Sequence, residues 1–220
     1  MDWFRPMDEY CERVDASFWS EPMNAISNAA FIVAAIMLFL QWRRVSGSGP
    51  YGPLLILNVF IIGVGSFLYH TFANRWSEIA DVVPIAAFIL FYLTLGLHSY
   101  LGLRWWQSLS AVAVFFALSQ LFVMGLEPTI GYTATYLPAL ATIYLVGLAM
   151  VSRQRSIANG LLLAGLVFTA SVMFRAADLP FCVWLPQGTH MVWHLLNATM
   201  LFLLVRLYLL QGSSAAPARH

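Results

Sequence analysis

Residues 53–72 read PLLILNVFIIGVGSFLYHTF, an apolar run without a single Asp, Glu, Lys or Arg. A helix needs about 20 apolar residues to cross the hydrocarbon core of a membrane, so this run predicts a transmembrane helix. Six further apolar runs lie around it, at residues 24–41, 81–98, 108–126, 132–151, 157–174 and 189–210. The sequence therefore predicts an all-α, polytopic membrane protein with seven transmembrane helices in one domain, residues 24–210.

The composition agrees with a membrane protein. Hydrophobic residues make up 60% of the 220 residues and charged residues only 10%, whereas a typical soluble domain carries about 25% charged residues. Such a chain has too little polar surface to cover itself in water, and the solvent that it fits is lipid. A formal net charge of +1 speaks against a nucleic-acid partner.

Arginine is distributed unevenly between the two sides of the predicted bundle. Seven helices place the termini on opposite sides of the membrane. The side of the C-terminus carries Arg43, Arg44, Arg104, Arg153, Arg155, Arg206 and Arg219. The other side carries Arg5, Arg13, Arg75 and Arg175, together with most of the acidic residues. The positive-inside rule then places the N-terminus outside and the C-terminus in the cytoplasm.

This topology makes residues 1–23 an acidic extracytoplasmic segment and residues 211–220 a cytoplasmic tail. The chain has no lysine and is rich in alanine and arginine, a composition typical of a GC-rich bacterium. We therefore expect a bacterial inner-membrane protein whose outer side faces the periplasm.

The two cysteines, Cys11 and Cys182, both fall on the outer side in this topology. Disulfides persist in that compartment, so the positions permit a bridge. The alternative of two unrelated thiols stays open.

Three histidines converge near the outer ends of the predicted helices. His190 and His194 lie four residues apart at the start of the last helix, so their imidazoles share one helical face. His70 ends the helix of residues 53–72, which rises toward the same side. Three neutral imidazoles with one open position form a common catalytic zinc arrangement. Structural hydrogen bonding between helices is the alternative.

Three other polar residues accompany these histidines. Asp81 begins the predicted helix 81–98 at the same depth, where a carboxylate suits the role of a base or of a group that orients a ligand. Ser66 lies one turn before His70 and shares its face; close helix packing by a small residue is the alternative. Asn197 lies one turn beyond His194, where it orients a metal ligand or forms an interhelical hydrogen bond.

Four sequence elements, in this order, resemble the alkaline ceramidases, within the wider group of seven-helix membrane hydrolases and adiponectin-type receptors. The elements are Tyr10-Cys11-Glu12 with Glu21-Pro22-Met23-Asn24-Ala25-Ile26-Ser27-Asn28, then Ser66-x3-His70, then Asp81, then Phe181-Cys182 with Gly188-Thr189-His190-x3-His194. The resemblance covers nearly the whole chain.

The resemblance implies an activity and roles for individual residues. His70, His190 and His194 would bind zinc, Asp81 would hold or deprotonate the attacking water, and Ser66 would stabilise the oxyanion. Cys11 and Cys182 would form a disulfide. The expected reaction is hydrolysis of the amide bond of ceramide or a related N-acyl membrane lipid to a fatty acid and a long-chain amine.

The resemblance also implies a calcium site in the N-terminal segment. The matching residues are Glu9, Tyr10 through its backbone oxygen, Glu12 and Glu21, with Asp15 as a weaker candidate. Val14 departs from the pattern, because an asparagine ligand is expected there. Clustered oxygen ligands suit a hard cation, and an acidic tail without a metal is the alternative.

Two other functions remain open at this point. One is a non-catalytic or weakly catalytic zinc-containing receptor of the adiponectin-receptor type, and the other is a hydrolase of another acyl lipid. A retinal-based pump is excluded, because it needs a lysine for its Schiff base and the chain has none.

Overall fold

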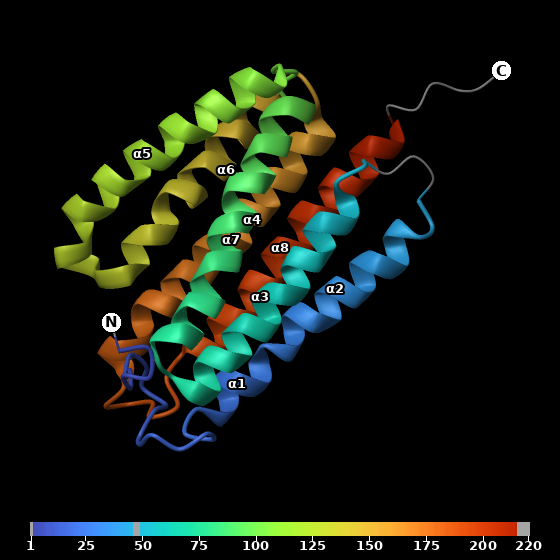
Figure 1. Cartoon of the computed structure of the whole chain (residues 1–220). Coiled ribbons are helices and arrows are strands. Elements are labelled where there is room, and N and C mark those ends of the chain that lie inside the picture. The colour runs from blue at the N-terminus through green and yellow to red at the C-terminus, as the bar shows by residue number, and fades with distance from the viewer. Residues whose placement is uncertain (1, 46–48, 215–220) are drawn as a thin grey trace.

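The computed structural model describes residues 2–45 and 49–214, which form eight α-helices and one 3₁₀-helix (Figure 1). The elements are α1 (Pro22–Ser27), α2 (Ala29–Trp42), α3 (Gly52–Phe72), α4 (Arg75–Ser99), α5 (Trp105–Ile130), η1 (Gly131–Tyr136), α6 (Leu137–Met150), α7 (Arg155–Phe181) and α8 (His190–Ser214). Within these ranges there is no β-strand, only an isolated bridge between Pro6 and Asn74. The predicted all-α class is confirmed.

Six helical stretches of the described chain are long and apolar enough to cross a membrane: Pro22–Trp42, Gly52–Phe72, Arg75–Ser99, Trp105–Met150, Arg155–Phe181 and His190–Gln211. The stretch Trp105–Met150 has 46 residues and contains α5, η1 and α6. The chain reverses direction at η1, so α5 and α6 run in opposite directions (Figure 1). The protein thus has the helices of a multi-pass membrane protein.

The outer surface of these helices is apolar. Leu121, Met124, Leu145 and Met173 each expose more than 60% of their surface. Such a surface is unfavourable in water and is expected where helices face lipid. Helix α5 is the extreme case, because only Ser108 and Val112 along it are buried.

The core lies between α2, α3, α4, α7 and α8. Helix α3 packs against α2, α4 and α8, and α8 also packs against α2 and α7. Phe31, Leu55, Leu95, Leu161 and Leu204 of these five helices are buried against one another. This packing fixes the ends of α3, α4, α7 and α8 relative to one another.

Helices α3 and α4 cross closely at Gly65. A Cβ atom at this position would collide with the backbone carbonyl of Ala80 in α4. Small residues at helix crossings in membranes permit this approach of two backbones. The crossing places Ser66 of α3 next to Asp81 of α4.

Helix α4 begins at Arg75, so the prediction that Asp81 begins this helix is wrong. The earlier start is stabilised by a capping box: Asn74 Oδ1 accepts from the Ser77 amide at 3.3 Å, and Ser77 Oγ accepts from the Asn74 amide at 3.0 Å. Asp81 lies inside the helix.

Other helix boundaries also differ from the prediction, and α5 and α7 continue to Ile130 and Phe181, beyond the predicted ends at residues 126 and 174. The first run is divided at Asn28 into α1 and α2. The run 132–151 begins as the 3₁₀-helix η1, and α6 starts only at Leu137, with a proline in its first turn. Helix α8 continues to Ser214, so the predicted tail begins in helix; its residues 215–220, including Arg219, lie outside the described residues.

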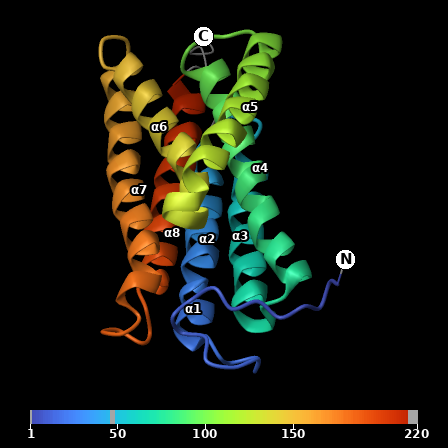
Figure 2. The same cartoon turned by 90° about the vertical axis from the view of Figure 1, so that its left-hand side faces the viewer.

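The N-terminal segment crosses one end of the bundle (Figure 2). Helix α1 and the turns between α3 and α4 and between α7 and α8 lie at this end. The amide of Met7 donates to the carbonyl of Ala73 at 2.8 Å. Cys11 and Cys182 lie at disulfide distance, with Cα atoms 5.2 Å apart across 171 residues of sequence, as the resemblance implied. The segment is thereby tied to the ends of α3 and α7.

Candidate metal centre

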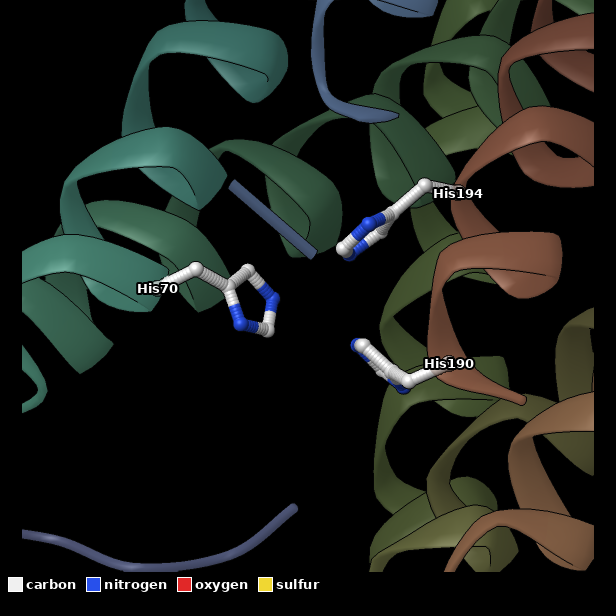
Figure 3. Close-up of side chains that lie close together, drawn as sticks. All are labelled: His70, His190 and His194. Carbon is white, nitrogen blue, oxygen red and sulfur yellow. The ribbon is translucent and has the colours of Figure 1, made fainter. Parts of the chain in front are cut away.

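Three buried histidines point toward one another at this end of the bundle (Figure 3). His70 comes from the last turn of α3, and His190 and His194 come from the first two turns of α8. The ring centroids are 5.1 Å apart for His70 and His190, 4.8 Å for His70 and His194, and 4.6 Å for His190 and His194. The predicted convergence of the three residues is confirmed.

The hydrogen bonds of His194 define which ring nitrogen carries its proton. Nδ1 of His194 lies 2.7 Å from Oγ of Ser27, and this hydroxyl donates to the carbonyl of Asn24 at 2.8 Å. A hydroxyl has one proton, so Ser27 accepts from the imidazole. The proton of His194 is therefore on Nδ1, and Nε2 keeps a lone pair that can bind a metal.

The carboxylate of Glu21 determines which ring nitrogen of His70 carries the proton. Its Nδ1 lies 2.6 Å from Oε2 of Glu21, and Arg13 Nε lies 2.5 Å from Oε1 of the same side chain. Burial alone raises the pKa of Glu21, but the hydrogen bonds from His70 and Asn24 and the charge of Arg13 hold it below its usual value. An ionised carboxylate only accepts, so Nδ1 of His70 donates. Nε2 of His70 is buried without any hydrogen-bond partner.

His190 is positioned through the start of α8. Asp178 of α7 accepts from the amides of Thr189 and His190 at 2.6 and 2.9 Å, which caps the helix as an N-cap carboxylate does. Gly188 has φ +65°, and a Cβ atom there would collide with Asp178. The imidazole packs on the ring of Tyr10, with centroids 4.0 Å apart, and its Nδ1 has no hydrogen-bond partner.

The group fits a metal ion by the chemistry of its donors. One ring nitrogen from each histidine lies within 4.8 Å of the others. Three histidine nitrogens with one open position are a common donor set for zinc. Buried polar atoms without a partner are rare, and a metal would satisfy Nε2 of His70. The three residues could therefore hold a metal ion.

Asp81 and Ser66 face the same cavity as His190 and His194. Both residues are buried, the Ser66 hydroxyl lies beside the Asp81 carboxylate, and Oδ1 of Asp81 has no hydrogen-bond partner. The close crossing of α3 and α4 at Gly65 creates this pair. The two residues are thus available to a molecule in the cavity.

The cavity continues away from the histidines as an apolar slot. A second cavity, lined almost entirely by apolar side chains from Ile62 to Leu204, shares Ile85, Tyr136 and Asn197 with the first. Asn197 stands where the two meet, and its Oδ1 has no hydrogen-bond partner. The partner of His194 is Ser27 instead, so the predicted orienting role belongs to Ser27 in this structure.

The predicted calcium ligands have protein partners. Both carboxylate oxygens of Glu12 accept backbone amides, from Met23 at 2.7 Å and Asn24 at 2.8 Å. The oxygens of Glu21 accept from Arg13 and His70. The backbone oxygen of Tyr10 accepts from the amide of Arg13 at 3.2 Å.

The two remaining candidate calcium ligands, Glu9 and Asp15, also accept hydrogen bonds from other residues. Glu9 accepts from the Tyr69 hydroxyl at 2.8 Å, and Asp15 accepts from the amide of Ser17 at 2.8 Å. The buried guanidinium of Arg13 supplies the positive charge among these oxygens. Because these oxygens already have protein donors, the arrangement does not suit a calcium ion.

Four residues of the centre were not singled out by the sequence: Arg13, Ser27, Arg175 and Asp178. Ser27 lies inside the motif Glu21–Asn28, but serine in an apolar helix carries no distinctive signal. Asp178 and Arg175 lie inside α7, where ionisable residues are expensive and usually functional, but the predicted run ended at residue 174 and so left them out.

No protein-family model matches the chain, and comparison with curated proteins finds no significant match.

Proposed function

We propose that the protein is a zinc-dependent intramembrane hydrolase that cleaves the amide bond of ceramide or a related N-acyl lipid to a fatty acid and a long-chain amine. The observation that carries the proposal is the group of three buried histidines, two of which, His190 and His194, line a cavity that also holds Asp81 and Ser66. The resemblance of these same residues to the alkaline ceramidases also supports it.

Zinc fits this donor set, because three neutral imidazoles and one open position are typical of catalytic zinc. When bound, it would lower the pKa of a coordinated water to about 7 and polarise a carbonyl oxygen. Glu21 and Ser27 fix the rings of His70 and His194, and the second nitrogen of each would hold the ion.

Asp81 supplies proton transfer in this proposal. Its unpartnered Oδ1 accepts a proton from the attacking water and passes it to the leaving amine. Ser66, beside it, donates a hydrogen bond to the carbonyl oxygen as negative charge develops there.

The shape and depth of the cavity support a lipid substrate. The slot that leads away from the histidines is apolar over most of its length, which suits an acyl chain. The histidines themselves lie at the end of the bundle, the level at which an N-acyl lipid presents its amide. A lipid would therefore place its amide at the metal and its chain in the slot.

We further propose seven spans, with α5 and α6 as two of them, and an outer position for the metal centre. At the metal end Arg13 pairs with Glu21 and Arg75 with Glu78, which neutralises part of its positive charge. Arg43, Arg44, Arg104, Arg153 and Arg155 at the opposite end have no carboxylate within 4.0 Å among the described residues. By the positive-inside rule that end faces the cytoplasm, and the metal centre faces the periplasm of a bacterial inner membrane.

The test is release of long-chain amine from ceramides and other N-acyl lipids by purified protein in detergent, with zinc content measured in parallel. We expect His194→Ala to lose zinc and activity together. His98→Ala is the matched control, because His98 bonds to the carbonyl of Leu103 at the other end of α4. Hydrolysis by zinc-free protein would refute the mechanism, and a fully zinc-loaded protein without turnover would favour a receptor.

A further inference from the structure

Arg175 of α7 lies in a box of aromatic rings beside the metal centre. Its Cζ is 5.8 Å from the ring centroid of Tyr10, 5.1 Å from that of Tyr136 and 5.4 Å from that of Trp193. Nη1 donates to the Tyr10 hydroxyl at 3.3 Å. The ring of Tyr10 packs in turn on His190, so one aromatic ring separates the guanidinium from the histidines.

This guanidinium has no carboxylate partner. Among the described residues none lies within 4.0 Å of it. Asp178, one turn along α7, accepts the amides of Cys11, Thr189 and His190 instead. Nε of Arg175 is buried without a hydrogen-bond partner. Arginine has five N–H donors, and the Nε donor of the half-buried Arg175 is thus left for a partner from outside the protein.

Removing part of a guanidinium from water is costly unless an anion pairs with it. Cation–π contacts with three rings stabilise the charge, but they leave its hydrogen bonds unmade. A carboxylate or phosphate oxygen is the usual bidentate partner of such a group. The aromatic box around Arg175 would also fit a purely structural role, in which it holds the N-terminal segment in place through Tyr10. The position of Arg175 relative to the cavities decides between this role and anion binding.

Arg175 lines both the metal cavity and a further cavity formed by the N-terminal segment, η1 and the end of α7. The apolar slot for an acyl chain leads in the other direction. Glu9 also lines both cavities, but its carboxylate bonds to Tyr69. An amide at the histidines would therefore direct its amine half toward Arg175.

We propose that Arg175 binds an anionic group on the amine half of the substrate. The inference rests on the proposed function and names its substrate class: N-acyl lipids whose amine half carries a carboxylate or a phosphate, in preference to neutral ceramide. Because hydrogen bonds to charged groups are stronger than neutral ones, we expect a preference of about tenfold to a hundredfold over a neutral analogue.

The test compares ligands that differ in this group alone. N-oleoylglycine and N-oleoylglycinamide form the carboxylate pair, and ceramide 1-phosphate and ceramide form the phosphate pair. Binding to the zinc-loaded protein is followed by tryptophan fluorescence on rapid mixing, before turnover, because Trp193 lies against Arg175. Amine release is measured in parallel.

Three variants make the result specific. Arg175→Gln should abolish the preference, and Arg175→Lys, which keeps the charge, should retain part of it. Arg155→Gln is the matched control, because Arg155 is an exposed residue at the opposite end of α7 and the preference should be unchanged. Thermal unfolding of each variant confirms that it is folded.

The outcomes separate this inference from the proposed function. A preference within either pair that Arg175→Gln removes supports the inference and identifies the anion as a carboxylate or a phosphate. Equal binding within both pairs, or a preference that survives Arg175→Gln, overturns it. Binding with the expected preference but no amine release would leave the inference standing and refute the hydrolase.

Discussion

At the residue scale, each histidine is held by a different kind of contact. Glu21 fixes the ring of His70, Ser27 fixes that of His194, and Tyr10 packs on that of His190. Because a proton on Nδ1 of His70 and His194 leaves Nε2 as the donor atom, the outer contacts determine which nitrogen can bind the metal.

Removing the Ser27 hydroxyl should therefore weaken metal binding without removing a ligand. We expect Ser27→Ala to lower zinc affinity by about tenfold to a hundredfold, because His194 loses the group that orients it. A competition titration with a chelating indicator measures the change. Ser99→Ala, an exposed serine at the far end of α4, should have no effect, and equal affinities of the two variants would contradict the role of Ser27.

Arg13 neutralises Glu21 in a buried environment. Replacing it with methionine leaves a buried carboxylate without its cation, so Arg13→Met should lower the free energy of unfolding by about 3–5 kcal/mol. Denaturation in detergent measures the loss, and the double variant Arg13→Met with Glu21→Gln should recover part of it.

The effect of calcium on the melting temperature tests the hydrogen bonds of Glu12 and Glu21. Because the oxygens of Glu12 and Glu21 already have protein donors, adding calcium chloride to the dialysed wild-type protein should leave its melting temperature unchanged. A clear rise would show that the ion competes with Arg13 for these carboxylates.

At the element scale, the site depends on two close approaches between helices. Gly65 lets α3 and α4 cross with their backbones in contact, which brings Ser66 to Asp81. Gly188 lets the start of α8 lie against Asp178 of α7, which orients His190. Neither approach leaves room for a Cβ atom.

A methyl group at position 65 should therefore disturb both stability and the site. Gly65→Ala places Cβ against the backbone of Ala80, and overpacking of this kind costs about 1–3 kcal/mol. We expect a lower melting temperature and loss of amine release. The control is Gly125→Ala in α5, where nothing lies within 4 Å of the added atom, and a change of less than about 0.5 kcal/mol is expected. Similar behaviour of the two variants would contradict the crossing.

At the scale of the whole molecule, the two ends of the bundle differ in chemistry. One end carries the N-terminal segment, the cysteine pair and the three histidines, and the other carries most of the arginines. An apolar belt of exposed side chains lies between them. This polarity is the basis of the proposed orientation.

Single cysteines test that orientation. Phe4 is 75% exposed in the N-terminal segment, and Arg44 is exposed at the opposite end. In intact cells with the outer membrane removed, a membrane-impermeant thiol reagent should label Phe4→Cys and should label Arg44→Cys only after permeabilisation. The reverse pattern would place the metal centre in the cytoplasm.

The sequence by itself predicted the helical class, the apolar runs and the convergence of His70, His190 and His194. These features follow from local properties: run length against the thickness of a bilayer, and the four-residue spacing that aligns two side chains on a helix. The start of α4 was misplaced because Arg75 and Glu78 make its first turn polar, whereas capping by Asn74 and Ser77 extends the helix through it.

Only the tertiary structure assigned partners to the ionisable side chains. Ser27 and His194 are 167 residues apart in sequence, and so are Cys11 and Asp178; no spacing rule connects such pairs. The acidic N-terminal segment has the same composition whether its carboxylates bind an ion, amides or Arg13. Which one they bind depends on helix packing, because packing brings Arg13 to Glu21 and leaves Arg175 among aromatic rings, with no carboxylate of the described residues within 4.0 Å.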